Sequence, residues 1–137
     1  MLPSGIIKYI GECNRGLSML KEKISVFIDN IKSIEGVSAC ALISRDGIIA
    51  GKFFDQDMNE PWFGALSATI LASAESVGSL IKLKSMESVT IRAHETSVVI
   101  MGAGENFLIT SIIRHKTDSD KVYTEMQIVA KKIGEVM

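Results

Sequence analysis

The sequence has little of what metal, redox and nucleic-acid sites are built from. It holds two cysteines in 137 residues, Cys13 and Cys40, which form no CxxC pair. No second cluster of ligand-type residues accompanies them, so a zinc site or a redox pair is not indicated. The net charge is −1, and no electrostatic case exists for binding nucleic acid or an anionic membrane. We therefore expect no metal, no other cofactor and no nucleic-acid partner.

Long apolar runs are also absent. No uninterrupted apolar segment reaches the roughly 18 residues that a membrane-spanning helix needs. The first residues, MLPSGIIKYIGECNRG, contain only short apolar pieces, broken by Lys8, Gly11 and Glu12. This is not the pattern of a signal peptide. We expect a soluble, cytoplasmic protein without a membrane span.

Motifs for nucleotide binding and catalysis are missing as well. The sequence contains no GxxxxGK[ST] motif. The Gly-rich stretch MGAGENF, residues 101–107, is followed by a strand-like segment, whereas a phosphate loop needs a helix at that point. No Ser–His–Asp or Cys–His arrangement stands out. We expect a protein that is not an enzyme.

What the sequence does contain is the composition of one globular domain. Apolar residues make up 47% and charged residues 23%. Residues 1–17 stand apart as an N-terminal arm, and residues 18–137 are expected to form a single domain. The sequence does not decide whether the arm is loose or docks on a hydrophobic surface. Its short apolar patch consists of Ile6, Ile7, Tyr9 and Ile10.

The spacing of apolar residues predicts an α+β fold in the order α-β-β-α-β-β-β-α. Asp46-Gly47 between two alternating runs is typical of a tight hairpin, because glycine takes positive φ without a Cβ clash. Joins of hairpin length make the five-stranded sheet antiparallel. Its strands are apolar on both faces, so helices must cover both. The predicted helices cover 18–34, 62–81 and 119–136, and the predicted strands 37–44, 48–54, 87–94, 97–103 and 106–114.

The middle predicted helix has too little charge for a surface helix. Within 62–81, WFGALSATILASAESVGSLI, only Glu75 is charged. The helix could be buried within its own domain, or it could pack on the same helix of a second copy through a two-fold axis. The sequence favours the second interpretation, because the other two helices can cover only the opposite sheet face. The face expected to pack on the sheet is Phe63, Leu66, Ile70, Val77 and Ile81.

Three features, in this order, resemble the roadblock/dynein light-chain family. They are IEGVSACALISRDGIIAG, then the nearly uncharged Ala/Ser-rich helix, then SVTIRAHETSVVIMGAGENFLITSII. The resemblance covers roughly residues 19–136. It implies a profilin- and longin-like layout with one helix on one sheet face and two on the other. It also implies dimerisation through the middle helix and the third strand. The implied role is that of a non-enzymatic scaffold or regulator of Ras-like small GTPases or, in eukaryotes, of dynein motors.

Together these observations predict a homodimeric scaffold whose further partner is a small GTPase. Trp62 and Arg45 are candidate contacts at the rim of the partner surface, although Trp62 could instead seal the core and Arg45 could be a plain turn residue. The alternative is a small-molecule sensor domain of PAS- or GAF-like layout. An aromatic content of only 6% disfavours such a ligand pocket. The predicted dimer-interface residues are Ala65, Ala68, Thr69, Ala72, Ser76, Val89 and Ile91.

Overall fold

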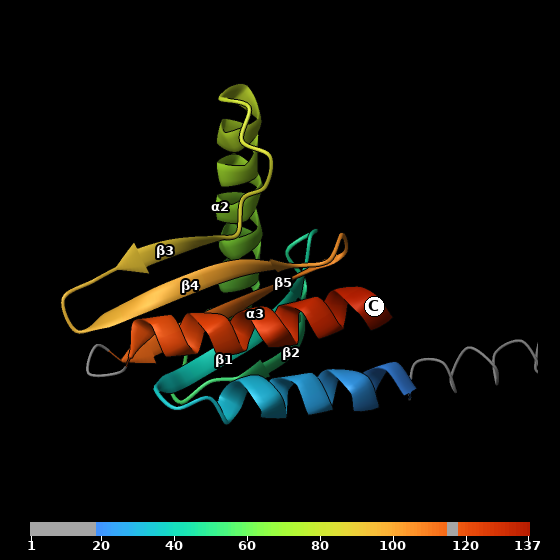
Figure 1. Ribbon diagram of the computed structural model, residues 1–137. Helices are drawn as coiled ribbons and strands as arrows, with labels where there is room; N and C mark the ends of the chain where they lie inside the picture. The colour runs from blue at the N-terminus through green and yellow to red at the C-terminus, as the bar shows by residue number, and fades with distance from the viewer. Residues whose placement is uncertain (1–18, 115–117) are drawn as a thin grey trace, which may run out of the picture.

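The computed structural model describes residues 19–114 and 118–137, which form three helices and a five-stranded antiparallel sheet (Figure 1). The predicted N-terminal arm, residues 1–17, lies outside the described residues. The element order confirms the predicted fold class. A first helix covers residues 19–32, and the other elements are β1 Val37–Ser44, β2 Ile49–Phe53, α2 Glu60–Leu80, β3 Ser88–Arg92, β4 Thr96–Ala103, β5 Phe107–Arg114 and α3 Ser119–Val136.

The strand order in the sheet is β2-β1-β5-β4-β3, and every neighbouring pair is antiparallel. The predicted hairpin at Asp46-Gly47 is confirmed, because Gly47 has φ of 90° and its N–H donates to the Ser44 carbonyl at 2.9 Å. A second tight turn joins β4 to β5, with Gly104 at φ of 75°. The two edges of the sheet are therefore β2 and β3, and in the described structure β3 pairs only with β4.

Helices cover both faces of the sheet, as the apolar strands require. The first helix and α3 lie side by side along the strands on one face, and α2 lies on the other (Figure 1). On the two-helix side, Ile31, Met126 and Ile133 are fully buried in one cluster with Leu42 and other strand side chains. On the α2 side, a smaller cluster forms around Leu71, packed on strand side chains such as Ile43, Ile100 and Leu108.

Helix α2 runs across the strands, and its C-terminal end extends beyond the β3 edge of the sheet (Figure 1). The helix ends with Lys82 in the left-handed region, at φ of 60°. The Leu83 N–H donates to the Gly78 carbonyl at 2.9 Å and closes the last turn. This end carries exposed apolar side chains, namely Leu80, Ile81 and Leu83.

Candidate interaction surface

The N-terminal end of α2 is fixed by its cap and by an ion pair to β2. The Asn59 side chain accepts a hydrogen bond from the Trp62 N–H at 3.2 Å, and Pro61 occupies the first turn, where a missing N–H is tolerated. Lys52 of β2 forms an ion pair with Glu60 in the same first turn. The start of α2 is thereby held beside the β1–β2 hairpin.

Two glycines bring α2 unusually close to this hairpin. A Cβ at Gly64 would collide with the carbonyl oxygen of Gly47, and a Cβ at Gly47 would lie only 2.9 Å from the Ala65 Cα atom. Contact at this distance is possible only between backbones without side chains. The glycines therefore set the height of α2 over the sheet.

This close approach changes which face of α2 is buried, and the sequence-based prediction of that face was wrong in part. Phe63 and Ile70 do pack against the core, but Leu66, Val77 and Ile81 are exposed. The helix sits so near the sheet that mainly small side chains fit beneath it. Its buried residues are Gly64, Ser67, Ala68, Leu71 and Gly78.

The opposite face of α2 presents a stripe of apolar and small side chains to solvent. Trp62 is 65% exposed, Leu66 52% and Leu80 83%. Between these ends the stripe continues with small residues that are also exposed, Thr69, Ser73 and Ser76. The positions 62, 66, 69, 73, 76 and 80 follow alternating steps of four and three, which is the spacing with which one helix packs along another.

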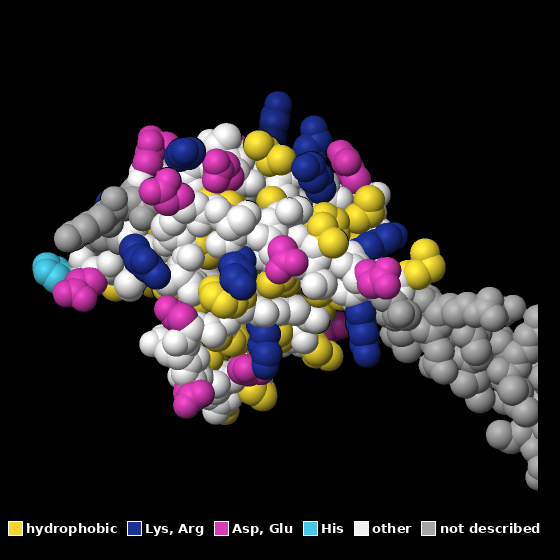
Figure 2. All heavy atoms as spheres, turned by 90° about the horizontal axis from the view of Figure 1, so that it is seen from below, with side chains coloured by type: hydrophobic (Ala, Val, Ile, Leu, Met, Phe, Trp, Pro, Cys, Tyr) yellow, Lys and Arg dark blue, Asp and Glu magenta, His cyan; other side chains and the backbone are white. Residues whose placement is uncertain are grey.

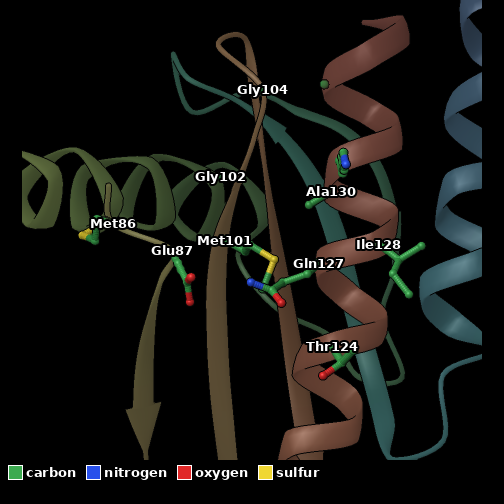
Figure 3. A pocket seen from close by; sticks show the side chains of 11 residues that line it. Met86, Glu87, Met101, Gly102, Gly104, Thr124, Gln127, Ile128 and Ala130 are labelled. Atoms are coloured by element: carbon green, nitrogen blue, oxygen red, sulfur yellow. The ribbon is translucent and has the colours of Figure 1, made fainter. Parts of the chain in front are cut away.

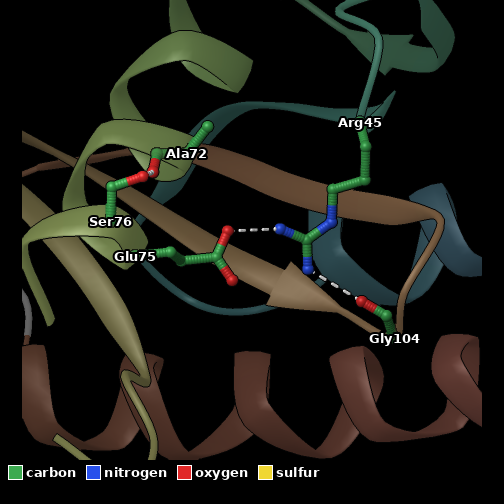
Figure 4. A network of polar contacts seen from close by, with 5 residues as sticks. All are labelled: Arg45, Ala72, Glu75, Ser76 and Gly104. Carbon is green, nitrogen blue, oxygen red and sulfur yellow. Dashed lines mark hydrogen bonds and ion pairs between the residues drawn. The ribbon is translucent and has the colours of Figure 1, made fainter. Parts of the chain in front are cut away.

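The charge on α2 nearest this stripe, Glu75, is paired with a cation of the same chain. Arg45, from the β1–β2 turn, donates to Glu75 at 2.8 Å and to the Gly104 carbonyl at 2.8 Å (Figure 4). The pair is partly exposed, so its contribution to stability is no more than about 1 kcal/mol. Its larger effect is that the carboxylate of Glu75 is paired within the chain. The predicted contact of Arg45 with a partner protein stays a prediction.

The residues predicted for the dimer interface lie in two places. Ala65, Thr69, Ala72 and Ser76 are exposed on α2, and Ile91 is exposed on the edge strand β3. Val89, also on β3, is half-buried against the α2-side cluster. Ala68 differs, because it is 8% exposed and belongs to the contact between α2 and the sheet. Four of the seven positions are thus exposed on α2, and the role of all seven as an interface stays a prediction.

Trp62 does not seal the core, which was the simpler interpretation of its position. Phe63 has that role instead, since its ring packs edge-on against Phe54 with centroids 5.5 Å apart. Trp62 projects from the first turn of α2 at the end of the outward stripe. The sequence could not distinguish the two neighbouring aromatics, because which of them points inward depends on how α2 is rotated over the sheet.

On one face of the molecule the charged groups form no field of one sign. Acidic and basic side chains are interspersed over the face seen in Figure 2. In residues 19–114 and 118–137, no group of three or more His, Cys, Asp or Glu side chains is placed to hold a metal ion. By length and composition alone α2 could also cross a membrane. Its glycine contact with the hairpin instead makes it part of the domain.

Cys40 of β1 is buried in the core on the side of the two helices. Burial raises the pKa of its thiol to about 11, although Lys32 partly opposes this effect. In a Cys13→Ser variant we expect Ellman's reagent to label Cys40 at pH 8 more than about a hundredfold more slowly in native protein than in denatured protein. The reason is that the thiolate, which a pKa near 11 keeps scarce, is the nucleophile. Equal rates would show that Cys40 is accessible.

The Gly-rich turn after β4 has no helix for a phosphate to approach. Residues 104–106 turn directly into β5, and the Gly104 carbonyl already accepts from Arg45. We expect no saturable heat when GTP or ATP is titrated into the purified protein, because a strand and not a helix N-terminus follows this turn. A saturable isotherm with either nucleotide would contradict this expectation.

Comparison with known families identifies the domain. The family model described as "Roadblock/LC7 domain" matches residues 23–112. The chain belongs to the Roadblock/LC7 domain family. No curated protein sequence matches the chain.

Several solved structures share this fold. MglB of Myxococcus xanthus superposes with a TM-score of 0.77 at 14% identity, covering 83% of this chain and 94% of that one. The gliding protein MglB of Thermus thermophilus superposes with a TM-score of 0.75 at 14% identity, covering 83% of this chain and 87% of that one. A Roadblock/LC7 domain from Streptomyces avermitilis superposes with a TM-score of 0.69 at 15% identity, covering 77% of this chain and 88% of that one. At these identities the likeness concerns the fold.

Proposed function

We propose that this chain is a non-enzymatic, homodimeric interaction module that regulates a Ras-like small GTPase in the cytoplasm. The dimer is proposed from the outward face of α2. Large apolar side chains are exposed there, and no unpaired charge interrupts the stripe. Contiguous exposed apolar surface of this kind marks protein interfaces. Burying a Trp or Leu side chain fully stabilises an association by about 1.5–3 kcal/mol.

The stripe is complementary to itself in an antiparallel pair of α2 helices. If the pair is centred near residue 71, Trp62 of one helix meets Leu80 of the other. Leu66 then meets Ser76, with Val77 beside it, and the small side chains at 69 and 73 meet in the middle. Large apolar ends thus face one another, and small side chains let the helix axes approach at the centre. A two-fold axis produces this arrangement without any second type of surface.

The free edge of β3 lies on the side of the sheet past which α2 extends (Figure 1). Its outer backbone groups can pair with the same strand of a second copy, which would continue the sheet across the dimer. Ile91, 42% exposed on this strand, would be covered by that pairing. One solved MglB is described as having a tetrameric arrangement, which supports assembly as a property of this fold.

Membership of the Roadblock/LC7 family and the MglB-like fold support a GTPase as the further partner. Paired α2 helices would form a platform across the dimer axis, with Trp62 at its rim. The sensor alternative is less well supported. A groove beside α3 is open to solvent and is lined by no aromatic side chain, and a second groove of the same volume, which Phe53 and Phe54 line, is also open.

Affinity capture from the native cell, with GDP and with a non-hydrolysable GTP analogue, tests this function. We expect one small GTPase to be enriched in at least one nucleotide state. Its rate of hydrolysis or nucleotide exchange should change when purified protein is added. A partner that binds without any effect on nucleotide turnover, or the absence of a GTPase from the captured proteins, would contradict the proposal.

Binding measurements with the identified GTPase then test where the partner surface lies. Trp62→Ala should weaken its binding at least about tenfold, because aromatic anchors at interfaces typically contribute about 2 kcal/mol or more. Lys131→Ala, on the opposite face of the sheet, should leave binding unchanged. If only the Lys131 variant loses affinity while both dimers remain intact, the platform is not the GTPase site.

A further inference from the structure

A groove of about 680 Å³ runs along the side of α3 that faces away from the first helix. Gln127 points from α3 toward Met101 at its floor, while Met86 and Glu87 lie on the other side, where the chain enters β3 (Figure 3). Ala130 continues the apolar wall. Glu87 is held in place by a 2.6 Å hydrogen bond from the Tyr123 hydroxyl. The groove therefore has an apolar floor and polar rims.

The groove exists because two helices are too narrow to cover five strands. Strands lie about 4.8 Å apart, so the sheet is roughly 24 Å wide, whereas helices pack at about 8–10 Å from one another. The first helix and α3 share one core cluster over the central strands. In the described part of the chain no third element covers β3 on this face. The groove lies beside α3, over Met101 and Gly102 of β4 and the residues that lead into β3.

The chain itself supplies a segment of suitable length. Residues 1–18 precede the first helix, whose described end lies on the same side of the molecule as the C-terminal end of α3 (Figure 1). Tyr9 precedes Met19 by ten residues. That length of chain reaches up to about 33–36 Å when extended, which is some three helix diameters. The segment can therefore pass the end of α3 and enter the groove.

The composition of this segment matches the groove. Its apolar patch would cover the floor, and two charged residues flank or interrupt it, Lys8 and Glu12. The rims carry charges of the opposite signs, Glu87 and Lys131. We propose that residues 1–18 dock in this groove of their own chain, with Tyr9 and its isoleucine neighbours against Met86 and Met101.

Photo-crosslinking in the full-length protein tests the proposal. Tyr9 is replaced by p-benzoyl-phenylalanine, whose ketone inserts into nearby C–H bonds and favours methionine. We expect crosslinks within one chain, mapped by mass spectrometry to Met86 or Met101. Crosslinks to α2 or β2 would overturn the proposal, and so would crosslinks formed only between two chains, which would place a second copy's arm in the groove.

Matched variants separate docking from chance proximity. Gln127→Trp fills the groove and should reduce the crosslink yield at least about tenfold, equivalent to about 1.4 kcal/mol of docking free energy. Lys132→Trp, exposed on α3 outside the groove, should leave the yield unchanged. Ile10→Asp, in the arm itself, should reduce the crosslink yield as much as Gln127→Trp does. It gives the same test if the Gln127→Trp variant does not fold. Equal yields in all variants would show that no docking occurs.

Discussion

Thr69→Glu is expected to convert the dimer into a folded monomer. Thr69 is exposed near the centre of the outward stripe of α2, and its side-chain oxygen bonds only to the Ala65 carbonyl of its own helix, at 2.8 Å. In the proposed pair the two introduced carboxylates would be buried without partners. Such burial costs about 3 kcal/mol or more, which weakens the dimer more than about a hundredfold. Light scattering after gel filtration measures the mass, and circular dichroism measures the fold.

Glutamate substitutions at two other positions serve as controls. Thr124→Glu places the same change on α3, where the Thr124 hydroxyl makes the equivalent bond to the Asp120 carbonyl at 2.9 Å; the dimer should persist. Ala68→Glu buries a charge between α2 and the sheet and should abolish folding. If Thr69→Glu remains dimeric at micromolar concentration, α2 is not the interface.

Gly64→Ala should lower the free energy of unfolding by about 2–3 kcal/mol, although alanine usually favours a helix. The added methyl group would meet the carbonyl oxygen of Gly47, which is backbone and cannot rotate away. Relief requires α2 or the β1–β2 hairpin to move. Gly47→Val should be at least as destabilising, because it adds a branched side chain at φ of 90°, against the Ala65 backbone. Urea denaturation monitored at Trp62 measures both.

Gly78→Ala in the same helix is the matched control. The nearest atom to a Cβ there is in the flexible Leu83 side chain, at 3.6 Å. Without a clash, helix propensity dominates, and the variant should be more stable than wild type by about 0.5–1 kcal/mol. Equal effects of Gly64→Ala and Gly78→Ala would show that α2 does not approach the hairpin as described.

Local patterns were sufficient to predict most of the fold. The expected third helix agrees with α3, and the Asp46-Gly47 turn has the positive φ that its sequence requires. The observed strand boundaries differ from the predicted ones by one or two residues. At β3, for example, the strand ends where its pairing with β4 ends, and composition does not determine that position. These features follow from spacing and turn chemistry, which act over a few residues.

The candidate surface could be predicted only in outline. The scarcity of charge in α2 indicated an uncovered helix, but its rotation depends on the contact between Gly47 and Gly64, two positions far apart in sequence. For that reason Leu66 was expected inside and is outside. The ion pair of Arg45 with Glu75 is equally non-local. No local pattern carries information about such contacts.

Sedimentation equilibrium of the wild-type protein tests the central claim, self-association through α2, most directly. The protein should be studied at micromolar concentration, alone and without any GTPase. We predict a mass that is twice the 14.9 kDa of one chain, and no less than that at the lowest concentration measured. A mass of 14.9 kDa throughout the micromolar range would contradict the two-fold packing of α2 and leave its apolar face to another kind of partner.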